Sequence, residues 1–389
     1  MDRSVRVCRI VVRTTNGVLI SRRGTSGGEH VATEARPGPT GTGAGASRRR
    51  VLTTAVLGSA FAALPGRAVG AGQDASHEGA YGGTDHARGG EAGADGGEAG
   101  APVRPAESAA GDWTQVAAEL GRKGSMLGKL IYRTAFPRTD LHVVSHGVTV
   151  SSELAVGSHV SFIRYADNTT LTMGELAVTE AELPKVIGAL QSHGIEQVAI
   201  HNHLPAHTPR LVWIHTHGHG PNAVALARGL RAAFAHTGTP PAKSSTTPPK
   251  KLKLDTAGID AALGTTGTVY GSVYKSAFLR RETITDGGYL LPPGSGATTA
   301  FSFQPVGGGR AALSGDVAVL AGEAQHVLGV LQRDGIGIVE LHNHGLVDSP
   351  RMFFIHVWAV GDAVKIARAL HRAVAATNAA PANGAGGGE

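Results

Sequence analysis

With 389 residues and a single cysteine, Cys8, the chain is long enough for about two domains and can form neither an intramolecular disulfide nor a thiolate zinc site. The formal charge of +6 is concentrated in residues 1–71, which hold 11 arginines against three acidic residues and leave 25 basic and 27 acidic residues elsewhere. Because basic and acidic residues nearly balance beyond residue 71, that part of the chain lacks the excess positive charge that binds a polyanion. We therefore expect no nucleic-acid partner.

The first feature in chain order is an export signal. Residues 47–50 read Ser-Arg-Arg-Arg, and the apolar run over 51–64 that follows is too short to span a bilayer. Residues 1–71 are therefore interpreted as an N-terminal extension plus a twin-arginine (Tat) signal peptide, with a basic tail beside a buried helix as the alternative. We expect an extracellular or envelope-associated protein that has no transmembrane segment in its mature chain and, lacking a cysteine after the apolar run, no lipid anchor there.

Composition divides the remaining chain into two domains. Residues 72–111 are rich in Gly and Ala with almost no large apolar side chain, which predicts a disordered tether. Residues 238–253 contain four prolines and several lysines and are interpreted as a linker. The predicted domains are residues 112–237 and 254–378, followed by a disordered tail over 379–389.

The two domains are copies of one unit, offset by about 140 residues. The strongest match is a motif H-N-H-x5-P-R-x4-H, which occurs at identical spacing over residues 201–215 and 342–356. The pairs Ala135-Phe136 and Ala277-Phe278 belong to the same alignment. The chain is therefore an internal duplication.

Each copy reads as a β-α-β-β-α unit. In the first copy we expect a strand over 174–178, then a helix with Thr179 as its N-cap, Glu182 as its capping-box partner and Gly194 at its end. Strands over 198–201 and 211–215 flank a turn over 204–209, and a second helix begins after Asn222, with its counterpart after Asp362. This order predicts an α+β fold, with a mixed or antiparallel sheet and helices on one face, of ferredoxin-like kind. We expect the two copies to pack as a pseudo-twofold pair.

The histidines of the motif are candidate metal ligands. Because side chains alternate along a strand, His201 and His203 point to one face, and the returning strand brings His215 nearby. Three imidazoles suit zinc or another divalent transition metal. The second copy offers the equivalent set His342, His344 and His356.

Further polar residues are candidate site members. Glu175 and its partner Asp316 are the most plausible added carboxylate ligands, and they or Glu340 are candidates for a general base. Ligand-binding candidates are Arg210 and Arg351, which could hold a phosphate or carboxylate, together with Asn202 and Asn343.

Structural roles are the alternative for the same residues, because His and Asn near a hairpin can hydrogen-bond its backbone. His207, His217 and His219 occur in the first copy alone. The last two either enlarge the site or are solvated loop residues.

The segments 199–203, 209–215 and 341–356 resemble the LppY/LpqO family of exported bacterial proteins, in which a leucine-His-Asn-His run is followed by Pro and then Phe-x-His. The resemblance covers residues 112–377. It implies an exported domain of uncharacterised activity. Family members are often described as lipoproteins, and this chain departs from them because it has no cysteine after its signal.

These observations predict an exported two-domain protein that binds a divalent metal or a small anionic ligand at paired histidine sites, with metal-dependent hydrolysis as one activity. A non-enzymatic envelope module for ligand binding and a purely structural role for the histidines remain the alternatives.

Overall fold

The computed structural model describes residues 101–242 and 251–382. The predicted signal peptide, the predicted tether up to residue 100, residues 243–250 of the linker and the tail beyond residue 382 lie outside this range.

The first repeat is built on a six-stranded antiparallel sheet. Its order is β1-β2-β5-β6-β9-β7. A smaller sheet has the order β4-β3-β8. The strands are β1 (Ser125–Leu127), β2 (Ile131–Pro137), β3 (Val143–Ser145), β4 (Val148–Val150), β5 (Gly157–Arg164), β6 (Thr170–Thr179), β7 (Glu196–His201), β8 (His207–Thr208) and β9 (Leu211–Gly220).

The second repeat has the same arrangement, with the order β10-β11-β14-β15-β18-β16 and a smaller sheet β13-β12-β17. One additional strand, β19, pairs with β11. The strands are β10 (Thr268–Tyr270), β11 (Val273–Arg280), β12 (Thr285–Asp286), β13 (Tyr289–Leu290), β14 (Thr298–Gly307), β15 (Arg310–Leu320), β16 (Gly337–His342), β17 (Asp348–Ser349), β18 (Met352–Asp362) and β19 (Ala379–Pro381).

The helices complete the expected β-α-β-β-α order, which is β6, α2, β7, β9, α3 in the first repeat. Because β9 lies between β6 and β7 and is antiparallel to both, β6 and β7 run parallel and α2 is their crossover. The predicted α+β class is confirmed. The helices are η1 (Ala110–Trp113), α1 (Thr114–Leu120), α2 (Leu183–Ser192), α3 (Ala223–Phe234), α4 (Thr256–Leu263), α5 (Ala321–Arg333) and α6 (Ala363–Ala375).

The predicted caps at Asn222 and Asp362 are present, but the N-cap of α2 is Glu182 and not the predicted Thr179. Glu182 accepts from the Thr179 backbone N–H at 2.8 Å, and Thr179 Oγ1 accepts from the Glu182 N–H at 3.3 Å, so the capping box forms one turn ahead of α2. Asn222 and Asp362 each accept a backbone N–H of the helix that follows.

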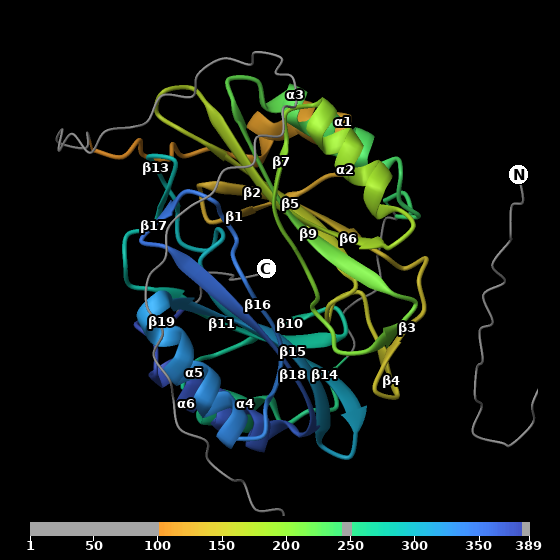
Figure 1. Ribbon diagram of the computed structural model, residues 1–389, viewed down its shortest axis with the longest axis vertical. Helices are drawn as coiled ribbons and strands as arrows, with labels where there is room; N and C mark the ends of the chain where they lie inside the picture. Colours follow the sequence, from red (N-terminus) through yellow and green to blue (C-terminus); the bar gives the residue numbers. More distant parts are fainter. Residues whose placement is uncertain (1–100, 243–250, 383–389) are drawn as a thin grey trace, which may run out of the picture. The chain divides into compact units, whose positions relative to one another are not determined.

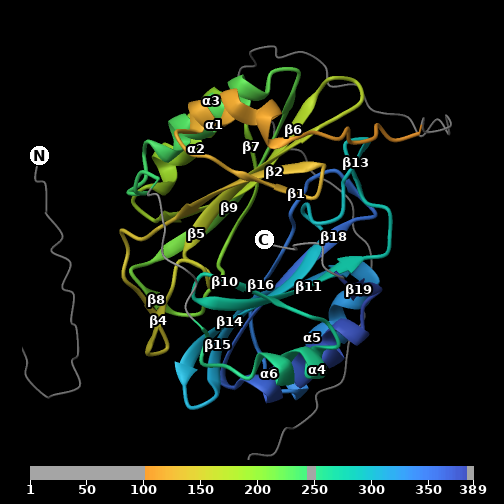
Figure 2. The same cartoon turned by 180° about the vertical axis from the view of Figure 1, so that it is seen from behind.

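The helices cover the outer face of each sheet, and the inner faces of the two sheets pack on one another (Figures 1 and 2). Alternation along β6 and β9 sends Leu176 and Ile214 into the helix-side core. The inner faces form two further cores that combine both repeats. In one of them Trp213 of β9 and Trp358 of β18 belong to the same cluster. The described part of the molecule is therefore layered helix, sheet, sheet, helix.

Parts of the predicted disordered tether and tail, and one residue of the predicted linker, are held by hydrogen bonds of their backbone groups to the repeats. Val103, assigned to the tether, exchanges backbone hydrogen bonds with Gly288 and Leu290 of the second repeat. Pro240, assigned to the linker, accepts a hydrogen bond from Arg122. Residues 379–381, assigned to the tail, form β19. Hydrogen bonds of the backbone hold these residues against the repeats, and composition does not reveal such bonds.

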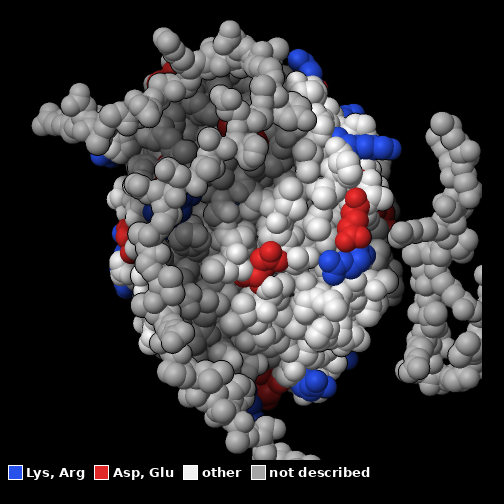
Figure 3. All heavy atoms as spheres, viewed as in Figure 1, with Lys and Arg blue, Asp and Glu red and all other residues white. Residues whose placement is uncertain are grey.

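The surface carries no dominant charge on the side drawn in Figure 3, where basic and acidic side chains lie singly or beside one another. Among the described residues, no helix is both long and apolar enough to cross a membrane.

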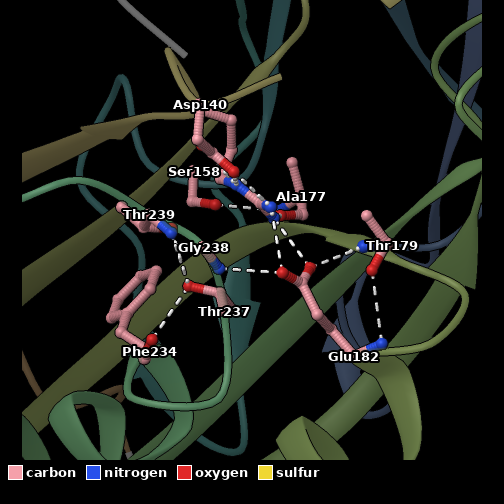
Figure 4. Close-up of polar contacts among 10 residues, drawn as sticks. Asp140, Ser158, Ala177, Thr179, Glu182, Phe234, Thr237, Gly238 and Thr239 are labelled. Carbon is pink, nitrogen blue, oxygen red and sulfur yellow. Dashed lines mark hydrogen bonds and ion pairs between the residues drawn. The ribbon is translucent and has the colours of Figure 1, made fainter. Parts of the chain in front are cut away.

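A buried arginine ties each sheet to its first crossover helix. The Arg138 guanidinium is fully buried and donates to Asp140, Glu182 and the Ala177 carbonyl of β6 (Figure 4). Arg280 repeats the network with Glu282, Glu323 and the Ala318 carbonyl. Planar, forked donors fit this arrangement because each guanidinium serves several acceptors at once.

We expect Arg138→Lys to lower the free energy of unfolding by about 2 kcal/mol or more, because one ammonium group cannot keep these forked contacts. The matched Arg280→Lys should have the same effect. Chemical denaturation measures both. The control is Arg228→Lys, whose side chain is exposed and which should change stability by less than about 0.5 kcal/mol. A loss in Arg138→Lys no larger than in the control would contradict this role.

Candidate functional site

Polar side chains occupy the centre of both inner sheet faces. In the first sheet, Glu175 of β6 lies in register with His215 of β9, and in the second sheet Asp316 of β15 lies in register with His356 of β18. Their chain neighbours point to the helix side, so alternation sends these four side chains inward. Each sheet thus presents a carboxylate beside an imidazole.

The H-x-H pairs enter from the edge strands. His201 is the last residue of β7 and lies in register with Trp213, and His342 is the last residue of β16 and lies in register with Phe354. His203 and His344 follow two residues later, at ring centroid distances of 5.1 Å from His201 and His342, respectively.

All six motif histidines and both carboxylates meet between the sheets; we call these eight residues the histidine cluster. The rings of the equivalent residues His201 and His342 stack with centroids 4.0 Å apart. Contact between equivalent residues is the mark of a twofold axis, so the repeats are related by a pseudo-twofold at this point. The members are Glu175, His201, His203, His215, Asp316, His342, His344 and His356.

The sequence predicted one three-histidine site within each copy, but the structure mixes the copies. The His203 ring lies 3.7 Å from that of His356, and the His344 ring lies 4.0 Å from that of His215. Each H-x-H pair therefore meets the third histidine of the other repeat. The reason is the face-to-face packing of the sheets, which brings the opposite repeat closer than the in-plane neighbour.

Three groups in the cluster have ligand atoms within 4.8 Å of one another and could hold a metal ion. The first contains Glu175 with three histidines, including one from the second repeat, and the second contains Asp316 with two histidines. The third group shares one histidine with each of the other two, so an ion bound by the third group would compete with ions bound by the others. The groups are Glu175, His201, His203 and His356; Asp316, His342 and His344; and His201, His215 and His342.

The cluster is buried, and much of its hydrogen-bonding capacity is unmet. The side chains of His201 and His356 are fully buried. His356 Nδ1 lies 2.6 Å from Asp316 Oδ1, and Glu175 Oε1 lies 3.3 Å from His201 Nε2 and 3.5 Å from His215 Nε2. Other ring nitrogens of the cluster histidines are buried without a hydrogen-bond partner. Buried polar groups in folded proteins are normally paired, so such a concentration indicates a site for a ligand. These nitrogens are His201 Nδ1, His342 Nδ1 and Nε2, His344 Nε2 and His356 Nε2.

Glu175 and His203 are in direct contact, through Oε1 of the carboxylate and Nε2 of the ring. Burial opposes ionisation of Glu175, but His203 and its neighbours outweigh burial and hold the pKa of the Glu175 carboxyl well below its usual value. Burial likewise opposes the charged form of His203, yet Glu175 raises the pKa of this imidazole overall. The cluster thus offers an ionised carboxylate.

Four of the other histidines, His201, His215, His342 and His344, are held neutral. Burial lowers the pKa of His215 to about 4 despite the attraction of Glu175. Burial, with the like charges of neighbouring imidazoles, also lowers the pKa values of His201, His342 and His344. Neutral imidazole is the form that binds a metal ion.

The arginines predicted to bind an anion lie outside the cluster. The Arg210 side chain is 54% exposed and pairs with Glu180. Arg351 pairs with Asp348 and donates to the carbonyls of Gly345 and Leu346. Arg210 and Arg351 each follow the proline of the turn, and at that position their side chains contact acceptors close to the turn.

The asparagines join the two repeats. Asn202 donates its backbone N–H and its Nδ2 to Glu340 Oε2, at 3.1 and 2.9 Å. Asn343 donates to the Val198 carbonyl of the first repeat. Asn202 and Asn343 therefore hold the edge strands together, and Glu340 serves as their acceptor.

The additional histidines of the first repeat have separate partners. His207 bonds the Pro205 carbonyl and the Leu211 N–H within its own turn, and His219 meets Thr169. His217 Nδ1 lies 2.8 Å from Asp286 Oδ2 of the second repeat.

One inward residue beside the cluster was missed by sequence reasoning. His159 of β5 lies in register with Glu175, on the side away from His215. Burial lowers the pKa of His159 to about 3, and the positive charge of Arg133 adds to this effect. The alternation of β5 is the signal that could have found it, because Val160 and Phe162 point to the helix side.

Comparison with known proteins gives one family. A model described as Domain of Unknown Function (DUF1259) matches residues 114–236 and 257–376, one match in each repeat and together more than half of the chain. A search of curated proteins gives no match. Among solved structures, a double ringed trimeric shell protein, MSM0271 from the RMM microcompartment, is 11% identical over 53% of this chain and 82% of that chain, with a TM-score of 0.16. A likeness at that TM-score carries no argument.

We expect Glu340→Ala to lower the free energy of unfolding by about 1–3 kcal/mol, because it removes a charged acceptor of two N–H groups between the repeats. Thermal and chemical denaturation measure the change. Glu196→Ala, an exposed residue on β7, is the control and should be nearly neutral. Equal stability of the two variants would show that the hydrogen bonds from Asn202 to Glu340 contribute nothing to stability.

Proposed function

The chain belongs to the family described as Domain of Unknown Function (DUF1259), and on that premise we propose that it binds divalent transition-metal ions, zinc among them, at two composite sites in the histidine cluster. The observation that carries the proposal is the set of buried ring nitrogens without a partner, on His201, His342, His344 and His356, beside the carboxylates of Glu175 and Asp316. Leaving one such group unsatisfied costs about 1–3 kcal/mol, and a metal ion would satisfy several at once.

The first site consists of Glu175, His201, His203 and His356, whose ligand atoms lie within 4.8 Å of one another. The second site contains Asp316, His342 and His344, whose ligand atoms lie within 4.8 Å of one another. We add His215 to it as the pseudo-twofold counterpart of His356. In the second site, the contact between His215 and His344 stands where His356 and His203 meet in the first. Each set offers three imidazole nitrogens and a carboxylate oxygen, donors that suit zinc, copper, nickel, iron and manganese.

We expect protein purified without chelator to hold up to two metal ions per chain, measured by elemental analysis and by zinc titration after chelation. The composite pairing makes a distinctive prediction for double variants. His203→Ala with His356→Ala removes ligands of the first site alone and should leave one metal ion. His203→Ala with His215→Ala removes one ligand from each site and should leave none tightly bound.

The opposite pattern, with one ion left in the second double variant and none in the first, would show that each repeat builds its own site. An ion bound to the native state raises stability by mass action. Wild-type protein that is purified without metal, and whose thermal stability does not change when zinc is added, would therefore contradict metal binding altogether. His219→Ala and His326→Ala, exposed in the first and second repeats, are matched controls and should keep both ions.

Metal-dependent hydrolysis is the second candidate function, favoured by the partial exposure of one edge of the cluster. The side chains of His203 and His215 are 13% and 12% exposed, so solvent reaches part of each ring. A divalent ion in such a donor set lowers the pKa of bound water toward neutrality, which is the chemistry that hydrolysis needs.

We expect the zinc- or manganese-loaded protein to hydrolyse at least one member of a panel of phosphate and carboxylate esters, with turnover lost on chelation and in Glu175→Gln. His219→Ala should retain the activity. Stoichiometric metal with no turnover across the panel would favour instead a non-enzymatic module that binds a ligand in the envelope.

We also propose that the protein is exported by the Tat route and is of the LppY/LpqO kind. The twin-arginine sequence at 47–50 and the apolar run after it support export. The H-N-H-x5-P-R-x4-H motifs support the family relation. A thiol-free site agrees with export of an already folded, metal-loaded protein.

A further inference from the structure

Each carboxylate of the histidine cluster lies against a histidine that belongs to the other proposed metal site. Asp316, of the second site, is in register with His356, and its Oδ1 lies 2.6 Å from His356 Nδ1. Glu175, of the first site, is in register with His215, and its Oε1 lies 3.5 Å from His215 Nε2. Contacts within each sheet therefore connect the two sites.

These contacts arise because strand pairing and sheet packing act on the same two rings. Pairing of β15 with β18 puts His356 beside the carboxylate of its own repeat, while packing of the sheets puts its ring 3.7 Å from that of His203. His215 has the same two kinds of neighbour, with its ring 4.0 Å from that of His344. Each of these rings thus lies between a carboxylate of its own repeat and a histidine of the other.

The two nitrogens of His356 divide these contacts. Nδ1 faces Asp316, and Nε2 is buried without a hydrogen-bond partner. Histidines that bind a metal ion through one nitrogen almost always turn the other to a carboxylate, a carbonyl or water, which fixes the tautomer and the direction of the ring. Asp316 is placed to fix His356 in this way, with Nε2 left for the ion of the first site.

A carboxylate has two oxygens and can serve an ion and an imidazole together. The contact of Asp316 with His356 uses Oδ1. The contacts of Glu175 with His203 and His215 both use Oε1. The second oxygen of each carboxylate is thus left to act as a metal ligand.

We propose that Glu175 and Asp316 each act at both metal sites, as a ligand of one ion and as the group that positions the β9 or β18 histidine of the other site. The proposal rests on the proposed metal binding and adds that the two sites form one coupled centre. An ion that binds Asp316 changes the charge beside His356, so filling of one site alters the affinity of the other, and the effect is reciprocal.

A protein with one site left tests the positioning role. His203→Ala with His356→Ala removes two ligands of the first site and should leave one zinc ion in the second. Glu175 is no ligand of that ion. Even so, Glu175→Gln added to this pair should weaken zinc binding about 10-fold or more, measured by isothermal titration, because the charge beside His215 is lost while the shape of the side chain is kept.

The matched control in the same protein is Glu196→Gln, the same chemical change at an exposed residue of β7. It should leave the zinc affinity unchanged. Zinc affinity unaltered by Glu175→Gln, or lowered equally by Glu196→Gln, would overturn the proposal for Glu175.

The reciprocal experiment starts from His215→Ala with His344→Ala, which leaves the first site. Asp316→Asn should then weaken zinc binding by a similar factor, although Asp316 is no ligand of the remaining ion. An unchanged affinity would overturn the proposal for Asp316. Thermal denaturation of the metal-free variants checks that each amide substitution leaves the protein folded.

Nitrogen-15 NMR of the imidazoles in the zinc-loaded wild-type protein tests the same geometry without any substitution. His356 should bind zinc through Nε2 and carry its proton on Nδ1, facing Asp316. Coordination through Nδ1 would overturn the positioning role of Asp316, because that nitrogen would then be turned to the ion.

The metal sites and their coupling can fail separately. If neither one-site protein nor the wild-type protein binds zinc, the proposed metal sites are wrong. If each one-site protein binds one zinc ion with an affinity that does not depend on the carboxylate of the other site, the metal sites stand and the coupling is refuted.

Discussion

The packing of two antiparallel sheets with their inner faces together is the constraint on which the site depends. Apolar residues from both repeats form cores on that interface, and the histidine cluster lies on the same faces as those cores. Burial removes water from the imidazoles, so their nitrogens must be satisfied by carboxylates, by one another or by a bound ion. The unmet nitrogens follow from this enclosure.

The outer layers hold the carboxylate strands in place. Arg138 binds the carbonyl of Ala177, two residues beyond Glu175, while it pairs with the Glu182 that caps α2. Arg280 does the same at Ala318, two residues beyond Asp316. Stability and site geometry are therefore coupled, because one buried network fixes the strand, the crossover helix and the inward carboxylate.

The duplication has kept the eight residues of the histidine cluster and changed their surroundings. His159 beside Glu175 has Ala300 as its counterpart beside Asp316, and Glu340 beside His356 has Ala199 as its counterpart beside His215. The two sites thus share a donor set but differ in neighbours.

The sequence by itself determined the duplication, the β-α-β-β-α order, the helix caps at Asn222 and Asp362, and the eight residues of the cluster, because periodicity, capping and alternation act between near neighbours in the chain. The tertiary structure decided which histidines meet, sending His203 to His356. It also assigned Arg210 to the surface. Those outcomes depend on which sheet faces pack together, and that choice is made by the summed burial of apolar residues far apart in the sequence.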